Sequence, residues 1–227
     1  MSSSRLPGKT LAEIEGEPAL ALLVTRLRKA GEVDEVLVAT SVEAVDDPVE
    51  QLARELRCRV HRGSRDDVLG RFVGAADGYE GTVVRITSDC PLVDAAVVDA
   101  VVSLLDESPE ATYASNVEPR TFPVGLDVEA FSANTLREAD RVARDPELRE
   151  HVTLVMRRDP ERFPRVTLRC QEDLSSLRWT VDYPDDLEFV RLVAGRLGAR
   201  RHDADMWETL AAIRRSPSIA DFQGRRG

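Results

Sequence analysis

The chain lacks the features that mark membrane, secreted and nucleic-acid-binding proteins. No apolar run approaches the roughly 20 residues that cross a bilayer, and the N-terminus has no apolar stretch typical of a signal peptide. Its three cysteines, Cys58, Cys90 and Cys170, form no CxxC pair, so they indicate neither a zinc site nor a disulfide framework. The net charge is −10, whereas a phosphate backbone requires a basic face. We therefore expect a cytoplasmic protein with no nucleic-acid or membrane partner.

Lysine is also scarce, since only Lys9 and Lys29 are lysines among the 31 basic residues. Lys9 ends the run SSSRLPGK at 2–9, in which small residues let backbone N–H groups approach an anion. Arg5 adds a planar guanidinium for phosphate oxygens, and Lys9 adds a mobile positive charge. The run matches neither the Walker A nor the GxGxxG pattern. It indicates either a loop for the phosphates of a nucleoside triphosphate or a basic tail with a Pro-Gly turn.

The 227 residues suit one α/β domain that spans the whole chain, 1–227. Apolar runs of strand length alternate with segments of helical periodicity, as in a doubly wound sheet. The expected strands cover 36–39, 58–61, 83–87, 113–116, 126–131 and 166–170. The expected helices cover 18–30, 48–56, 67–76, 95–105, 133–143, 147–158, 184–197 and 204–214, and residues 221–227 are expected to fray.

Two aspartates are candidates for a metal site. Asp89 follows the strand expected at 83–87, where open α/β sheets place ligand-binding groups, and a carboxylate there can hold Mg²⁺. Asp182 lies one residue outside a helix whose first residue is Pro184, which leaves its carboxylate free to face the same ion. The alternatives are a turn aspartate at 89 and a helix N-cap at 182.

Polar residues lie at the end of one expected strand and just after the next one. Thr40 and Ser41 end the strand that begins at residue 36, and they could bond a base or ribose. Arg62 precedes a capping box that begins at Ser64, and it could face the nucleotide.

A second group of polar residues could bind a substrate. Strand alternation places Asp127 and Glu129 on one face, which is either a binding surface or a solvated sheet face. Glu150 and His151 are adjacent in an expected helix. For His151, substrate binding, a general-base role and a structural role all remain open.

Several motifs occur in a characteristic order along residues 2 to 200. They are SSSRLPGK at 2–9, LAEIEGEP at 11–18, VATS at 38–41, RGS at 62–64, RITSDCPL at 85–92, FPVGLDVE at 122–129, REHVT at 149–153 and RWTVD at 178–182. This series resembles the cytidylyltransferases that activate acidic sugars. Within that family it is similar to the spore coat polysaccharide biosynthesis protein F branch, which is homologous to CMP-Kdo and CMP-sialic acid synthetases.

The resemblance implies a three-layer α/β/α fold of the nucleotide-diphospho-sugar transferase type with a mixed sheet. It also implies a homodimer that uses Mg²⁺ to transfer CMP from CTP to an acidic sugar. The catalytic residues would be Arg5, Lys9, Asp89 and Asp182, with Asp89 and Asp182 as metal ligands. The amides of Ser2, Ser3 and Ser4 would help to hold pyrophosphate, Thr40, Ser41 and Arg62 would line the nucleotide pocket, and Asp127, Glu129, Glu150 and His151 would face the sugar.

The chain departs from this family at its start. The family places a hydrophobic strand before the phosphate loop, but Met1 lies directly in the loop. We expect that the true start lies upstream, because loss of a central strand would leave its neighbours with unpaired backbone groups. Two other functions stay open: a glycosyltransferase that uses a nucleotide sugar, and an inactive scaffold or regulatory subunit of the same fold.

Overall fold

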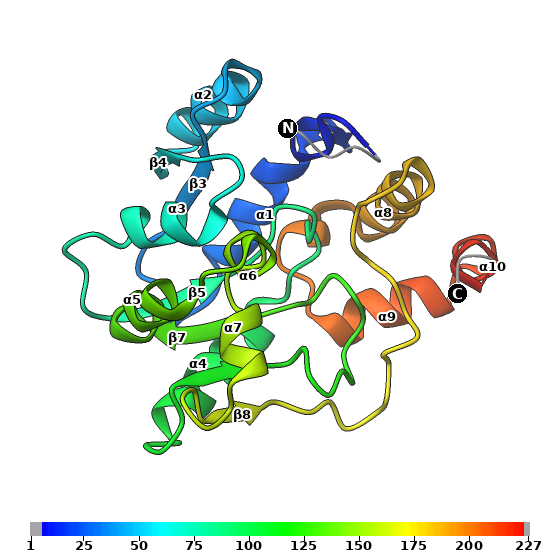
Figure 1. The fold of residues 1–227 in the computed structure, drawn as a ribbon. Coiled ribbons are helices and arrows are strands. Elements are labelled where there is room, and N and C mark those ends of the chain that lie inside the picture. Colours follow the sequence, from blue (N-terminus) through cyan, green and yellow to red (C-terminus); the bar gives the residue numbers. More distant parts are fainter. Residues whose placement is uncertain (1–5, 225–227) are drawn as a thin grey trace.

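The computed structural model describes residues 6–224, whose strands form three sheets (Figure 1). The strands are β1 (Glu13–Ile14), β2 (Glu17–Pro18), β3 (Leu37–Ser41), β4 (Arg59–Gly63), β5 (Thr82–Arg85), β6 (Tyr113–Ser115), β7 (Glu129–Ser132) and β8 (Arg165–Thr167). The α-helices are α1 (Ala19–Leu27), α2 (Asp47–Glu55), α3 (Val68–Ala75), α4 (Ala95–Asp106), α5 (Ala133–Val142), α6 (Pro146–Glu150), α7 (Leu154–Arg158), α8 (Pro184–Leu197), α9 (Met206–Arg214) and α10 (Pro217–Gly224). Short 3-10 helices are η1 (Lys9–Leu11), η2 (Ala44–Asp46) and η3 (Gly198–His202).

The largest sheet has the order β5-β7-β6-β8 and mixes antiparallel and parallel pairs. Neighbouring residues of one strand point into two different cores: Ala130 packs with α4 on one side, and Phe131 packs with α5 on the other. On β6, Ala114 points into the same core as Ala130, and Tyr113 points into the same core as Phe131. Helices therefore cover both faces of this sheet, which confirms the predicted α/β class with its helix–sheet–helix layering (Figure 1).

The parallel pair β3–β4 forms a separate unit, with α2 and α3 packed against it. Within residues 6–224, β3 hydrogen-bonds only to β4 and β5 only to β7. Residues of α2 pack in one hydrophobic core together with residues of α1 and α4.

Helix boundaries agree with the predictions where a cap residue marks them. Asp94 caps α4 by accepting a hydrogen bond from Ala96 N at 2.8 Å, and α8 begins at Pro184 with Tyr183 as its N-cap. The single helix predicted at 147–158 is wrong, because it divides into α6 and α7 around Val152, which has a positive φ of 48°. Fraying from residue 221 is also wrong as far as residue 224, because α10 extends to Gly224.

No helix in the described part of the chain is long and apolar enough to span a membrane.

Candidate active site

Lys9 joins two aspartates that lie far from it in the sequence. Its Nζ donates hydrogen bonds to Asp89 Oδ2 at 2.7 Å and to Asp182 Oδ1 at 2.8 Å. Gly8 precedes it in the left-handed conformation, with φ of 77°, and turns the chain into η1. Only 14% of the Lys9 side chain is exposed. We call these three residues the Lys9 centre, in which the structure brings together the two aspartates that the sequence singled out.

Asp89 is held by its own strand end and by the segment that carries Asp182. Thr87 Oγ1 donates to Asp89 Oδ1 at 2.5 Å. The Asp89 carbonyl accepts from Val181 N at 2.8 Å and from Thr180 Oγ1 at 3.0 Å. Backbone contacts therefore fix the spacing between the two aspartates independently of Lys9.

Asp182 lies outside α8, as predicted, and Asp186 performs the capping. Asp186 Oδ2 accepts from the backbone N–H of Asp182 at 2.7 Å and of Tyr183 at 2.8 Å. Arg178 Nη2 donates to Asp182 Oδ2 at 2.6 Å. Because Asp186 caps the helix, Asp182 Oδ1 accepts a hydrogen bond from Lys9 Nζ instead of capping α8.

Gly125 lets a neighbouring loop approach this segment closely. A Cβ at residue 125 would lie 2.5 Å from Thr180 N, and the residue has a φ of 108°. Next to it, Trp179 N donates to the Val124 carbonyl at 2.6 Å. A side chain at 125 would push this loop away from the segment that carries Asp182.

Lys9 and Asp182 are both charged at neutral pH. Burial lowers the pKa of the Lys9 ammonium, but Asp89 and Asp182 outweigh it and raise the pKa above its ordinary value of 10.5. Burial raises the pKa of the Asp182 carboxyl, but Lys9 and Arg178 outweigh it and hold the pKa below 3.8.

The Lys9 centre has donors that suit a magnesium ion. Oxygens of Asp89 and Asp182 already meet at one cation, the Lys9 ammonium. Mg²⁺ takes one or two protein carboxylates and completes its shell with water and phosphate oxygens. In the part of the chain that the structure describes, no three His, Cys, Asp or Glu side chains gather as a metal cage. The two aspartates supply the one or two carboxylates that Mg²⁺ takes from a protein.

A cavity of about 610 Å³ lies beside the Lys9 centre. Thr10 and Ser88, the chain neighbours of Lys9 and Asp89, line it, and their hydroxyl oxygens lie 3.2 Å apart. Thr40 and Ser41 line it as well, but both hydroxyls donate to Asp46 Oδ2, at 3.1 and 2.5 Å. The hydrogen bonds of Thr40 and Ser41 to Asp46 fix this wall of the cavity.

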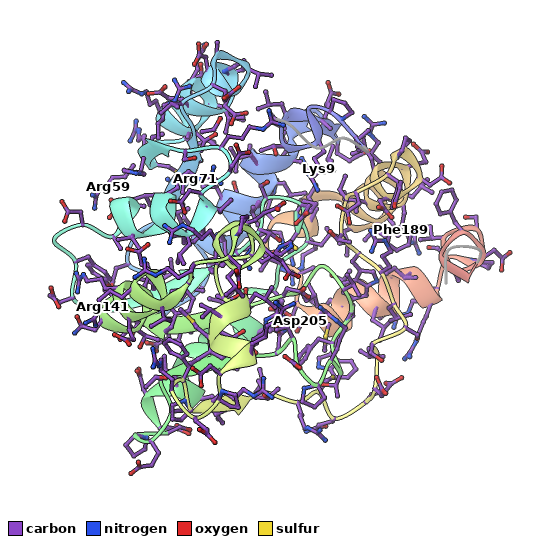
Figure 2. The ribbon with its side chains drawn as sticks, in the orientation of Figure 1. Lys9, Arg59, Arg71, Arg141, Phe189 and Asp205 are labelled. Carbon is purple, nitrogen blue, oxygen red and sulfur yellow. The ribbon has the colours of Figure 1, made fainter. Side chains whose placement is uncertain are left out.

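Arg71 on α3 lines the same cavity and was not among the sequence candidates. Its Nη1 donates to the Ser64 carbonyl at 2.9 Å, whereas its Nε is buried without a partner among the described residues. Figure 2 shows Arg71 beside α3, whereas Arg59 and Arg141 lie at the outer edge, with side chains 63% and 73% exposed. The burial of Arg71 has no sequence signal, because it depends on how α3 packs.

Arg62 does not line the cavity, contrary to the expectation that it faces the nucleotide. Its Nε donates to the Ser41 carbonyl at 2.8 Å, and its Nη1 lies 2.7 Å from carboxylates of Asp47 and Glu50. It fastens β4 to α2, because the two acidic residues in the first turns of that helix attract its guanidinium.

The residues expected to face the sugar are divided between two places. Asp127 and Glu129 line a second cavity of about 230 Å³, although Asp127 lies outside β7, which begins at Glu129. Glu150 instead lines the larger cavity, and His151 is exposed and lines neither. His151 is the C-cap residue of α6 and lies at the break between α6 and α7, so it does not continue the helix that carries Glu150. Arg5, Ser2, Ser3 and Ser4 lie outside the described residues.

Comparisons with known proteins agree with this geometry. The family model described as cytidylyltransferase matches residues 1–186. The chain is 31% identical over 229 residues to the spore coat polysaccharide biosynthesis protein SpsF of Bacillus subtilis, covering 97% of this chain and 93% of that protein. It is 36% identical over 112 residues to a 3-deoxy-manno-octulosonate cytidylyltransferase of Geobacter sulfurreducens, covering 48% of this chain and 43% of that protein.

Solved structures give the same result for the fold. A cytidylyltransferase from Leptospira borgpetersenii matches with a TM-score of 0.92 at 30% identity, covering 98% of this chain and 93% of that chain. A CMP:2-keto-3-deoxy-manno-octonic acid synthetase complexed with CTP matches with a TM-score of 0.65 at 19% identity, covering 86% of this chain and 95% of that chain. At that identity the second match shows the fold alone.

Proposed function

Because the chain belongs to the cytidylyltransferase family, we propose that it transfers CMP from CTP to a hydroxyl group of an acidic sugar. The observation that carries the proposal is the Lys9 centre, in which one ammonium bridges Asp89 and Asp182 at the edge of a 610 Å³ cavity. The acceptor oxygen bonds to the α-phosphorus while the bond from that phosphorus to the leaving oxygen breaks. Pyrophosphate departs with the electron pair, and the hydroxyl proton passes to water.

Asp89 and Asp182 would hold Mg²⁺ in this proposal. When bound, Mg²⁺ supplies positive charge that offsets the negative charge of the triphosphate. Lys9 has a flexible side chain, so its ammonium can leave the aspartates and bind phosphate oxygens of CTP. Thr87 and the backbone of residues 180–181 keep Asp89 in position when Lys9 moves. The chain thus contributes mainly alignment of reacting groups and charge stabilisation.

The larger cavity is the place we assign to the nucleoside. It borders the Lys9 centre through Thr10 and Ser88, and Arg71 adds a positive charge to its lining. Its volume is within the range of about 300 to 1,000 Å³ that is usual for small-molecule sites.

The acceptor class is supported by the relatives. One is named for 3-deoxy-manno-octulosonate, an acidic sugar, and another for spore coat polysaccharide biosynthesis. We also propose a cytoplasmic homodimer. Light scattering would then give twice the 25.2 kDa mass of the chain, whereas a single-chain mass at micromolar concentration would contradict the dimer.

Pyrophosphate release tests the function directly. The purified chain is mixed with Mg²⁺, a nucleoside triphosphate and a sugar acid, either 3-deoxy-manno-octulosonate or N-acetylneuraminate. We expect release with CTP that exceeds release with ATP, GTP or UTP and that stops when Mg²⁺ is chelated. Glucose as the acceptor is the neutral control. Equal release with all four nucleotides, or release that does not require an added acceptor, would contradict the proposal.

A further inference from the structure

Arg178 holds the oxygen of Asp182 that Lys9 does not. Its Nη2 donates to Asp182 Oδ2 at 2.6 Å and to Asp186 Oδ2 at 3.2 Å, and its Nε donates to Asp186 Oδ1 at 3.2 Å. Arg178 lines neither the larger nor the smaller cavity. It therefore contacts a candidate metal ligand without forming part of the wall of the cavity that we assign to the nucleoside.

Arg178 is fixed at both its backbone and its guanidinium. Its backbone forms a parallel bridge with Val124, flanked by a hydrogen bond from Val124 N to the Leu177 carbonyl at 2.9 Å. Asp186, with which the guanidinium pairs, is only 1% exposed and accepts the backbone N–H of Tyr183 at the start of α8. A planar guanidinium held by a buried carboxylate on a bridged backbone has little freedom to turn away.

Lys9 is held in a different way. Its ammonium lies at the end of a flexible four-carbon stem and binds Asp89 and Asp182 as a point charge. Asp182 thus has two cations with different properties. Arg178 is the one that stays, and Lys9 is the one that can be exchanged.

Each aspartate of the Lys9 centre presents one oxygen to the shared cation. Asp182 offers Oδ1 to Lys9 while Arg178 engages its Oδ2. Asp89 offers Oδ2 to Lys9 while Thr87 engages its Oδ1. Protein donors therefore fix the second oxygen of both carboxylates, and the first oxygens meet at one point.

We propose that Arg178 is a positioning residue of the transfer reaction, which keeps Asp182 Oδ1 directed at the cation position when Lys9 moves to the phosphates. This inference rests on the proposed function and deepens it. Because Arg178 occupies Oδ2, Asp182 would offer Mg²⁺ a single oxygen, which leaves more of the ion's shell to water and phosphate oxygens. Arg178 also ensures that Asp182 keeps a counter-ion throughout the exchange.

A split between turnover and binding tests the proposal. Arg178→Gln is expected to lower kcat for pyrophosphate release about 10- to 100-fold, because small misplacements of a reacting centre have effects of that size. The affinity for Mg·CTP should stay within about threefold of wild type, because Lys9 and both aspartates remain. An unchanged kcat would overturn the proposal. A fall in Mg·CTP affinity of about tenfold or more would also overturn it, because Arg178 would then bind the nucleotide itself.

Arg200→Gln is the matched control. Arg200 also bonds an acidic residue in the first turn of a helix, since it donates to Glu208 Oε2 at 2.6 Å. Glu208 in turn accepts the backbone N–H of Asp205 at 3.0 Å, in the way that Asp186 caps α8. Arg200 lines neither cavity. We expect a wild-type kcat in this control, and an equal fall in both variants would reduce the effect to helix capping and overturn the proposal.

A second variant covers the case in which Arg178→Gln fails to fold, since that change leaves the buried Asp186 without its arginine. Arg178→Gln/Asp186→Asn removes both charges, and asparagine still accepts capping hydrogen bonds. In thermal unfolding, this double variant should retain the wild-type transition to within a few degrees. Its kcat should fall as far as that of Arg178→Gln, and a wild-type kcat in the folded double variant would overturn the proposal.

The lysine ammonium groups give a readout that needs neither nucleotide nor turnover. The chain has two lysines, so ¹⁵N-lysine labelling gives one Nζ signal for Lys9 and one for the exposed Lys29, which is the internal reference. In Arg178→Gln the Lys9 signal should shift, because Asp182 is no longer held, and the Lys29 signal should not. Neither signal should shift in Arg200→Gln. An unchanged Lys9 signal in Arg178→Gln would overturn the proposal.

The same signals separate this inference from the proposed function. If the wild-type chain releases no pyrophosphate with any nucleotide, the transferase is contradicted. The Lys9 signal then still decides whether Arg178 orients Asp182, because it is recorded on the chain alone.

Discussion

The Lys9 centre and the 230 Å³ cavity lined by Arg85, Arg120 and Arg157, here called the arginine pocket, are neighbouring clusters that hold their charges differently. In the Lys9 centre one lysine bridges two aspartates, and Arg178 pairs with the second of them. The arginine pocket sets three arginines against the two carboxylates of Asp127 and Glu129. The comparison shows that basic groups are concentrated at particular places in a protein whose net charge is −10.

The clusters also differ in how they are built. The Lys9 centre joins three segments from residues 9, 89 and 182, and a single flexible lysine occupies its middle. The arginine pocket stands on strands β5 and β7 and on helix α7, with a buried glutamate at its base. We expect the first cluster to rearrange when CTP binds and the second to stay fixed.

The largest expected effect comes from breaking the acidic side. Asp89→Asn should lower turnover about 1,000-fold, comparable to the loss of a main electrostatic group in an active site. Folding stability should change little, because Thr87 and the backbone still hold the loop. The rate of pyrophosphate release at saturating Mg·CTP measures the change in turnover. Asp185→Asn is the control, since that aspartate is exposed on the first turn of α8. Turnover within tenfold of wild type would remove Asp89 from the metal site.

The base of the arginine pocket gives the next largest effect. Glu129→Gln should lower the free energy of unfolding by about 3 kcal/mol at pH 7, since it breaks the buried ion pair with Arg85 from one side. Urea unfolding measures this difference. Glu80→Gln is the control, because its pair with Arg137 is exposed and is expected to contribute under about 1 kcal/mol. Equal stability changes in the two variants would show that Glu129 is not a structural anchor.

Acidification should reduce the difference in unfolding free energy between wild type and Glu129→Gln. Burial raises the pKa of Glu129, but three partners outweigh it: Arg85, Thr153 and Tyr113. The pKa of Glu129 is lowered in the folded chain, so the stability that it contributes is present above its ordinary pKa of 4.5. This contribution is lost as pH falls through the lower, folded pKa. Below pH 4.5 the wild type and Glu129→Gln should therefore converge in unfolding free energy. A difference between them that stays constant down to pH 3 would contradict this account.

Lys9 gives an intermediate effect, on binding. Lys9→Ala should weaken Mg·CTP about 10- to 100-fold, because it removes a positive charge assigned to the triphosphate. Lys29→Ala is a close control, since Lys29 is the other lysine of the chain and is exposed. Unchanged affinity for Mg·CTP in Lys9→Ala would show that the ammonium only bridges the two aspartates.

Arg71 gives the smallest effect. Arg71→Gln should raise the KM for CTP about fivefold to tenfold, because it removes a positive charge that lines the larger cavity, although its Nη1 is already engaged by Ser64. The KM for the acceptor should not change. Arg59→Gln, on the exposed side of β4, is the control. A rise in the KM for the acceptor, with an unchanged KM for CTP, would assign the larger cavity to the acceptor instead of the nucleoside.

Local signals in the sequence predicted much of the fold and the acidic half of the site. Pro184 marked the start of α8 and thereby placed Asp182 outside it, and Asp94 marked the start of α4. The break at Val152 was missed, because helical periodicity continues across it and only tertiary packing imposes the positive φ.

The basic half of the site was not predictable. Arginines are abundant in this chain, and nothing local separates Arg157, which lies in the pocket, from Arg158, which faces solvent. Strand alternation left Asp127 and Glu129 as either a binding surface or a solvated face, and the family resemblance assigned them to the sugar. Their binding to arginines depends on distant segments. The sequence therefore singled out the carboxylates of Asp127 and Glu129, and the structure identified the arginines with which they pair.

Calorimetric titration of the wild-type chain with CTP, with and without Mg²⁺, tests the Lys9 centre most directly. We predict that CTP binds more tightly than ATP, GTP or UTP and that its affinity falls at least tenfold when Mg²⁺ is chelated, as expected for a triphosphate held through an ion between Asp89 and Asp182. Equal CTP affinity with and without Mg²⁺, or no binding by the folded chain, would contradict the account.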